Sequence, residues 1–127
     1  MKVIIQRVKS GSVSVEGDEI ARIQKGYVLL CGIKKGDDEQ AIQRMAAKIL
    51  NMRIMADEDQ KMNKSIGDVQ GEILAISQFT LYAETKGRRP GFGDAEEPVK
   101  AKQLFDKFVQ ELQRSGLSVQ TGQFGSY

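Results

Sequence analysis

The sequence contains no histidine, and this absence narrows the chemistry that the chain can perform. Nucleophilic catalysis by serine or cysteine usually relies on an imidazole as its general base. Zinc sites usually take histidine or several cysteines as ligands, and the chain has a single cysteine, Cys31. Unless a partner supplies such groups, hydrolysis must depend on positioned hydrogen-bond donors, water, carboxylates or groups of the substrate itself.

Cysteine, proline and long apolar runs are also scarce. One cysteine excludes an internal disulfide, and its place in the apolar run 27–31 predicts an inert core thiol. The absence of a disulfide framework is compatible with a reducing compartment. We expect no signal peptide and no membrane partner, because no apolar run is long enough for either, and we therefore predict a cytoplasmic protein.

The charge balance does not by itself indicate a nucleic-acid-binding protein. There are 19 basic and 17 acidic residues, which give a formal net charge of +2. Domains that bind nucleic acid usually carry a larger basic excess. If RNA is the partner, the basic residues must be concentrated locally.

The 127 residues fit one domain covering 1–127, with strands placed before, between and after two helices. Period-two alternation and apolar runs predict strands at 3–8, 12–16, 20–23, 27–33, 53–56, 72–76 and 117–121. Apolar residues at helical spacing predict one helix after Asp37, its expected N-cap, and another after the caps Asp94 and Glu97. Residues 57–70 are expected to form a loop with a turn of helix. This order predicts an α/β fold with mixed sheets and helices on one side, or alternatively an α+β fold.

No carboxylate cluster in the sequence predicts a metal or cofactor site. Asp37-Asp38 precedes a predicted helix, where a capping role is expected. Asp57-Glu58-Asp59 lies in a polar segment that is typical of a solvated loop. We therefore expect no metal and no cofactor.

The segment Ser77-Gln78-Phe79-Thr80 follows a buried strand and is the strongest candidate for chemistry. Short polar residues at such a place often do no more than complete a turn. A loop at the end of a strand can instead aim backbone N–H groups at a ligand while the sheet holds it rigid. Such donors stabilise the oxyanion of acyl transfer.

Together with its surroundings, this segment resembles the signature of the D-aminoacyl-tRNA deacylases. The resemblance continues through Lys86 to Phe92, Met62 to Ser65 and Thr121 to Gly125, and it begins with the strand Val3 to Val8. It implies a three-layer β/β/α fold and a homodimer that hydrolyses the ester of a D-amino acid with tRNA, a proofreading reaction of translation. It also implies that Ser77, Gln78, Phe79 and Thr80 form the floor of a catalytic pocket at the dimer interface.

The resemblance also implies a set of substrate-binding residues around that pocket. Lys86, Arg88 and Arg89 form the local basic concentration that RNA phosphates require, although a solvated loop is the alternative. Gly87 would let the backbone approach closely. Arg7 is implied at the pocket rim, near the entry of the other subunit's loop. The remaining residues implied are Pro90, Phe92, Gly122 and Phe124.

Thr80 is a poor candidate for the nucleophile, because the chain has no histidine to deprotonate it. An aminoacyl ester is already reactive and carries a neighbouring hydroxyl group. The hypothesis is therefore that backbone N–H groups near Phe79 and Thr80 polarise the carbonyl while water attacks with help from the substrate.

The sequence departs from the family at its C-terminal end. Family members continue with another strand and an Asn-x-Gly-Pro-Val-Thr segment that rejects L-amino acids, whereas the prolines here are Pro90 and Pro98. We expect a C-terminally truncated domain: a fragment, a naturally shortened chain, or a chain whose partner supplies the missing strand. Two other functions stay open, namely a tRNA-binding module without catalysis and a dimerisation domain.

Overall fold

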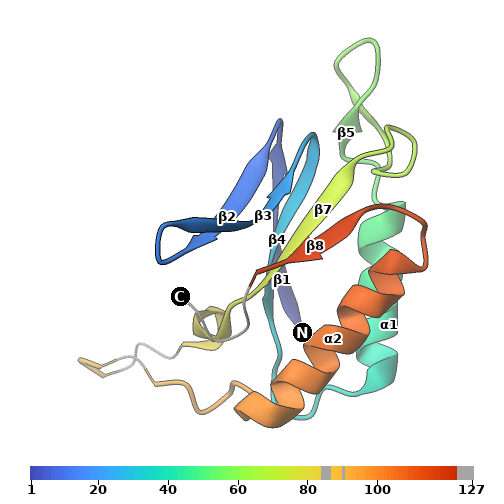
Figure 1. Cartoon of the computed structure of the whole chain (residues 1–127). Helices are drawn as coiled ribbons and strands as arrows, with labels where there is room; N and C mark the ends of the chain where they lie inside the picture. Colours follow the sequence, from blue (N-terminus) through green and yellow to red (C-terminus); the bar gives the residue numbers. More distant parts are fainter. Residues whose placement is uncertain (84–86, 90, 123–127) are drawn as a thin grey trace.

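A computed structural model describes residues 1–83, 87–89 and 91–122 and has three layers, as predicted (Figure 1). The central sheet contains, in order, β1 (Lys2–Val8), β4 (Gly26–Gly32), β7 (Glu72–Ser77) and β8 (Val119–Thr121). Helices α1 (Glu39–Asn51) and α2 (Pro98–Gln113) cover one face, and the hairpin of β2 (Gly11–Val15) and β3 (Asp18–Ile23) covers part of the other. The predicted β/β/α arrangement is therefore confirmed.

The apolar sequence of β4 follows from burial on both faces of the sheet. Tyr27, Leu29 and Cys31 are fully buried in the core beneath the helices. Val28, between them, packs with Ala21 of β3 in the smaller core beneath the hairpin. Side chains alternate between the faces of a strand, so a strand covered on both sides must be apolar at nearly every position.

The two helices begin at side-chain caps, one of which differs from the prediction. The carboxylate of Asp38, and not that of Asp37, accepts a hydrogen bond from the N–H of Ala41 at 2.8 Å. Asp37 instead pairs with the amino group of Met1 at 2.8 Å and accepts from the N–H of Lys34 at 2.7 Å. The pattern places the cap correctly to within one residue, because two adjacent aspartates can fill the same role.

Helix α2 begins at Glu97, one of its two expected caps, whereas Asp94 lies before the helix and does not cap it. Glu97 is its N-cap, and the carboxylate accepts from the N–H groups of Val99 and Lys100. Pro98 occupies the first turn, where its missing N–H would have no partner within the helix.

Two elements were not predicted. Residues 57–70, expected to be a loop with a turn of helix, contain no helix and include β6 (Met62–Lys64), which pairs with β5 (Met55–Ala56). The hydrogen bond from the Asn63 amide, together with bonds from backbone N–H groups, lowers the pKa of Asp57 in the turn between them. The second unpredicted element is the 3-10 turn η1 (Phe79–Tyr82), which follows β7 directly.

The pairing of the central strands brings three carboxyl ends to one edge of the sheet. β4 runs parallel to β7, and β7 parallel to β8, while the edge strand β1 runs antiparallel to β4. Cys31 is therefore the direct neighbour of Ser77. In open α/β sheets, ligands bind at the carboxyl ends of parallel strands, so this edge is where a site is expected.

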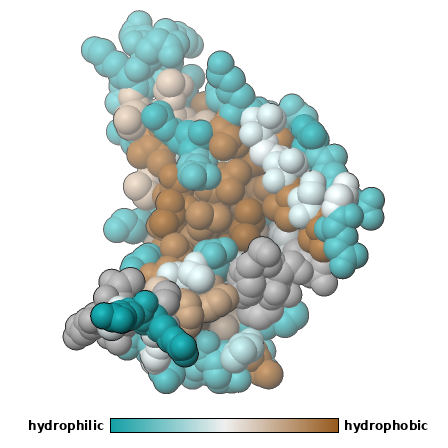
Figure 2. Space-filling model, turned by 90° about the vertical axis from the view of Figure 1, so that its left-hand side faces the viewer, coloured by the Kyte–Doolittle hydropathy of each residue, from teal (hydrophilic) through white to brown (hydrophobic). Residues whose placement is uncertain are grey.

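The face that carries the β2–β3 hairpin also exposes hydrophobic side chains (Figure 2). Ile4 of β1 is 44% exposed, and Ile20 of β3 is 46% exposed. Ile4 pairs with Leu30 and therefore lies on the hairpin side of the sheet. Among the described residues, no helix has the length and hydropathy needed to cross a membrane.

Candidate active site

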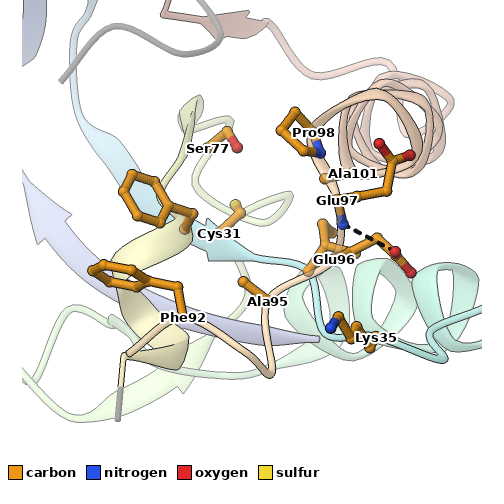
Figure 3. A pocket seen from close by; sticks show the side chains of 11 residues that line it. Cys31, Lys35, Ser77, Phe92, Ala95, Glu96, Glu97, Pro98 and Ala101 are labelled. Carbon is orange, nitrogen blue, oxygen red and sulfur yellow. Dashed lines mark hydrogen bonds between the residues drawn. The ribbon is translucent and has the colours of Figure 1, made fainter. Parts of the chain in front are cut away.

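A cavity of about 570 Å³ opens at the carboxyl edge of the sheet, between η1 and the beginning of α2 (Figure 3). Its walls come from the ends of β4 and β7, from η1 and from the segment that leads into α2. The lining residues are Cys31, Ile33, Lys35, Ser77, Phe79, Phe92, Ala95, Glu96, Glu97, Pro98 and Ala101. Most of this surface is apolar, as is usual for a small-molecule pocket.

Two walls of the cavity are attached to consecutive residues at the end of β4. The carbonyl of Cys31 accepts a 2.7 Å hydrogen bond from the N–H of Gln78, which fixes the start of η1. The carbonyl of Ile33 accepts from the N–H of Glu96 at 3.0 Å. These backbone bonds join segments far apart in the sequence and give the cavity a rigid frame.

An aromatic pair stands at the mouth of the cavity. The rings of Phe79 and Phe92 meet edge to face, with centroids 4.8 Å apart and planes inclined by 67°. They are 37% and 38% exposed, so both are open to a ligand. Figure 3 shows Phe92 across the cavity from Pro98. An apolar or planar group of a substrate can therefore contact rings on one side and aliphatic carbon on the other.

The polar groups of the predicted catalytic segment have distinct roles. The hydroxyl of Ser77 lines the cavity and has no hydrogen-bond partner among the described residues. Gln78 and Thr80 lie next to the cavity and do not line it, and the Gln78 amide donates to the Thr80 hydroxyl at 2.5 Å. The backbone N–H of Thr80 has no acceptor within the described part of the chain.

Cys31 forms part of the cavity wall as a neutral thiol. Its side chain is fully buried, and burial raises the pKa of the thiol to about 12. Only the thiolate is a strong nucleophile, so this group is unreactive at neutral pH. The predicted burial of this thiol in the core is confirmed.

The basic segment is described only in part. Gly87, Arg88 and Arg89 are exposed, whereas Lys86, Pro90 and Phe124 lie outside the described residues. Gly122 follows β8 and packs against Val13 of the hairpin, where a Cβ atom would come within 3.3 Å of that side chain. It is thus placed at the same edge of the central sheet as Ser77, on the side that faces the hairpin.

Arg7 lies away from this cavity within one copy of the chain. It pairs with Tyr27 at one end of β1, whereas Lys2 at the other end pairs with Gly32 beside η1. The guanidinium donates to the carbonyl of Ile54 at 3.1 Å. Burial raises the pKa of the Tyr27 hydroxyl, and the charge of Arg7 opposes that shift. A role for Arg7 toward a second subunit stays a prediction.

Comparison with known proteins agrees with the predicted resemblance. The sequence model of the D-Tyr-tRNA(Tyr) deacylase family matches residues 4–127. The D-aminoacyl-tRNA deacylase of Aquifex aeolicus is 50% identical over 127 residues, which are 99% of this chain and 86% of that protein. The Lactobacillus acidophilus enzyme of the same name is 49% identical over 127 residues, 99% of this chain and 88% of that protein. The chain belongs to the D-Tyr-tRNA deacylase family.

Solved structures of similar proteins support the family fold. A protein described as the c-Myc DNA Unwinding Element Binding Protein is 39% identical, with a TM-score of 0.92 over 100% of this chain and 87% of that one. A probable eukaryotic D-amino acid tRNA deacylase is 17% identical, with a TM-score of 0.83 over 98% of this chain and 89% of that one. The second similarity concerns the fold alone.

Sequence reasoning missed the far wall of the cavity in this family member. Ala95, Pro98 and Ala101 line it, but their sequence pattern indicates only a helix cap and the apolar stripe of α2. The apolar character of these three positions was the one sequence feature compatible with a place in a pocket wall. What the sequence could not give was the contact of this helix end with the ends of β4 and β7.

The buried thiol leads to a pH prediction. An unfolded chain releases the Cys31 proton near the ordinary thiol pKa of 9.0, whereas the folded chain retains it until about 12. The stabilisation is therefore complete below pH 9 and is lost as the pH rises toward 12. Urea denaturation should show that the unfolding free energy of the wild type falls more steeply than that of Cys31→Ala, by up to about 1.4 kcal/mol per pH unit.

The comparison with Cys31→Ala cancels the titration of tyrosines and lysines, which both proteins share. Parallel pH dependences of the two proteins above pH 9 would contradict the assignment of a buried neutral thiol.

Proposed function

We propose that this chain hydrolyses the ester bond of D-aminoacyl-tRNA and releases the free D-amino acid and tRNA. The observation that carries the proposal is the family match over residues 4–127, together with a cavity formed beside the Ser77–Thr80 segment. The apolar walls and the aromatic pair suit the aminoacylated end of a tRNA, where an adenine ring and an amino-acid side chain meet.

The proposed chemistry depends on positioning. We place the ester carbonyl beside the backbone N–H of Thr80, which has no acceptor in the described part of the chain. Such a donor stabilises the negative charge that develops on the carbonyl oxygen in the transition state. Water attacks the carbonyl carbon, the bond to the ribose oxygen breaks, and the ribose oxygen takes up a proton. The neighbouring hydroxyl of the ribose assists the attack.

Neither Thr80 nor Cys31 is assigned as the nucleophile. The Thr80 hydroxyl accepts a hydrogen bond from Gln78, which withdraws electron density from the oxygen, and the chain contains no histidine that could take its proton. The Cys31 thiol is held neutral by burial. We assign Ser77, whose hydroxyl lines the cavity, to substrate contact.

The proposed partner is tRNA, bound through the exposed residues Arg88 and Arg89. Lysine and arginine neutralise phosphates and release counterions, which gives RNA binding its salt dependence. We further propose a homodimer, because Ile4 and Ile20 expose apolar surface of the kind found at protein interfaces. A tRNA substrate implies action in the cytoplasm, beside the translation machinery.

The proposed activity predicts that D-tyrosyl-tRNA is deacylated, and L-tyrosyl-tRNA measured in parallel reports whether the two enantiomers are distinguished. The measurement is release of radiolabelled tyrosine at catalytic enzyme concentration, with a parallel filter-binding assay of tRNA. Binding without release would favour a tRNA-binding module, and the absence of both would favour a dimerisation domain.

Thr80→Ala should keep substantial activity, within about tenfold of the wild type, because the substitution removes the hydroxyl and leaves the backbone N–H in place. Single-turnover deacylation of D-tyrosyl-tRNA measures the effect. Thr121→Ala, on β8 away from the cavity lining, serves as the matched control. Near-total loss of activity in Thr80→Ala, with folding and tRNA binding intact, would assign the hydroxyl a direct catalytic role.

The double substitution Arg88→Ala/Arg89→Ala should weaken tRNA binding and reduce the slope of log K against log salt concentration by about 1 to 2. Binding titrations between low and moderate salt give this slope. Arg44→Ala/Lys48→Ala removes the same charge from the exposed side of α1 and should change the slope less. An unchanged slope in the Arg88/Arg89 variant would rule out phosphate contacts at this loop.

A further inference from the structure

The end of the η1 turn is held by a side chain from the edge of the sheet. The Lys2 ammonium donates to the carbonyl of Leu81 at 2.9 Å. The same nitrogen lies 4.9 Å from the centroid of the Tyr82 ring. A cation over an aromatic face is attracted by the ring, and a hydrogen bond from a charged donor is stronger than one between neutral groups. One exposed lysine thus makes two contacts with the last two residues of η1.

The η1 turn also packs against the backbone of the central sheet at Gly32. Gly32, the β4 residue that pairs with Lys2, has no side chain, and Leu81 and Tyr82 pack directly over it. A Cβ atom at Gly32 would lie 3.0 Å from the Cβ of Leu81 and 3.1 Å from the Tyr82 ring. Such distances are tighter than most contacts of real Cβ atoms, so a side chain here would require Leu81 and Tyr82 to shift by a few tenths of an ångström.

The beginning of the same turn is fixed independently. The N–H of Gln78 donates to the carbonyl of Cys31, the residue before Gly32. The N–H of Ala83, just after the turn, donates to the carbonyl of Thr80. The turn from Phe79 to Tyr82 is therefore attached at its start through Gln78, packs on Gly32, and is held by Lys2 at its end.

We propose that Lys2 is a positioning residue for the deacylation reaction, and that it acts by fixing η1 so that Phe79 and Thr80 keep their places beside the cavity. This inference rests on the proposed function. The hydrogen bond and the ring contact of the Lys2 side chain both go to η1, so its influence reaches the ester through the backbone of that turn. Displacement of a reacting group by about 1 Å can cost on the order of 100-fold in rate.

The structure separates this role from a general contribution to stability. Lys2 is exposed, and neither hydrophobic core contains its side chain. Loss of an exposed charge away from a core usually changes stability little. Its loss should therefore leave the fold intact while it loosens the turn that carries Thr80.

The test compares three lysine variants by steady-state deacylation of D-tyrosyl-tRNA. Lys2→Met keeps the length of the side chain and removes the charge, and we expect kcat to fall about tenfold with KM within about twofold. Lys2→Arg keeps a cationic donor over the ring and should restore kcat to within about threefold of the wild type. Lys9→Met, just beyond the other end of β1, is the matched control and should behave as the wild type.

Hydrogen exchange supplies a readout that does not depend on activity. In Lys2→Met the amide of Ala83 should exchange faster, because its bond to Thr80 lies in the released turn, while amides of β7 keep their protection. Gly32→Ala displaces the same turn from below and should produce the same pattern of lowered kcat and faster exchange.

Several outcomes would overturn the inference. A Lys2→Met variant with wild-type kcat and exchange, an equal loss in Lys9→Met, or a raised KM with unchanged kcat would each do so. The last result would mean that Lys2 contacts the RNA directly. An inactive wild type would instead overturn the proposed function, and the exchange data would then report only on the attachment of the turn.

Discussion

The parallel pairing of β4 with β7 is the constraint on which the rest of the site depends. It sets Cys31 beside Ser77 and brings both carboxyl ends to the same edge. From there, the carbonyl of Cys31 holds the start of η1 and that of Ile33 holds the segment leading into α2. Burial on both faces fixes β4 in place, since Leu29 lies in the core beneath the helices and Val28 in the core beneath the hairpin. A shift of one strand would therefore move both walls of the cavity together.

This rigidity suits a hydrolase that has no histidine. Without an imidazole to move protons, rate enhancement must come from two other sources. One is hydrogen-bond donors fixed where negative charge develops, and the other is a bound substrate held in the orientation that the reaction needs. The side chains around the cavity are consistent with catalysis by fixed donors rather than by a nucleophilic side chain. The Cys31 thiol is kept neutral by burial, and the Thr80 hydroxyl is engaged by Gln78. The Thr80 N–H is without an acceptor in the described ranges, and it is the backbone donor that we propose meets the carbonyl oxygen.

Local sequence patterns were sufficient to predict most of the strands and helices, and the family resemblance was sufficient to predict part of the site. Alternation and apolar runs predicted the central strands, and apolar residues at helical spacing predicted both helices, because those patterns reflect which faces are buried. They missed β6, whose Met62 and Asn63 are exposed and carry no alternation of burial, and η1, whose residues do not repeat long enough to show a helical period. Ser77, Phe79 and Phe92 were placed in the site by resemblance, and all three line the cavity. The contribution of Pro98 could not be predicted, because it arises only when the end of α2 meets the ends of two strands.

The short length of η1 explains why its attachments matter. A long helix is stabilised by its own ladder of hydrogen bonds, whereas a single 3-10 turn has few, and their geometry is poorer. Its orientation must then come from outside. The Cys31 carbonyl supplies one contact at the start, and Lys2 supplies another at the Leu81 carbonyl. Gly32 lets the turn lie close to the sheet between them. These contacts engage the two ends of the turn and do not involve the N–H of Thr80, which has no acceptor within the described chain, so the turn is oriented without occupying that donor.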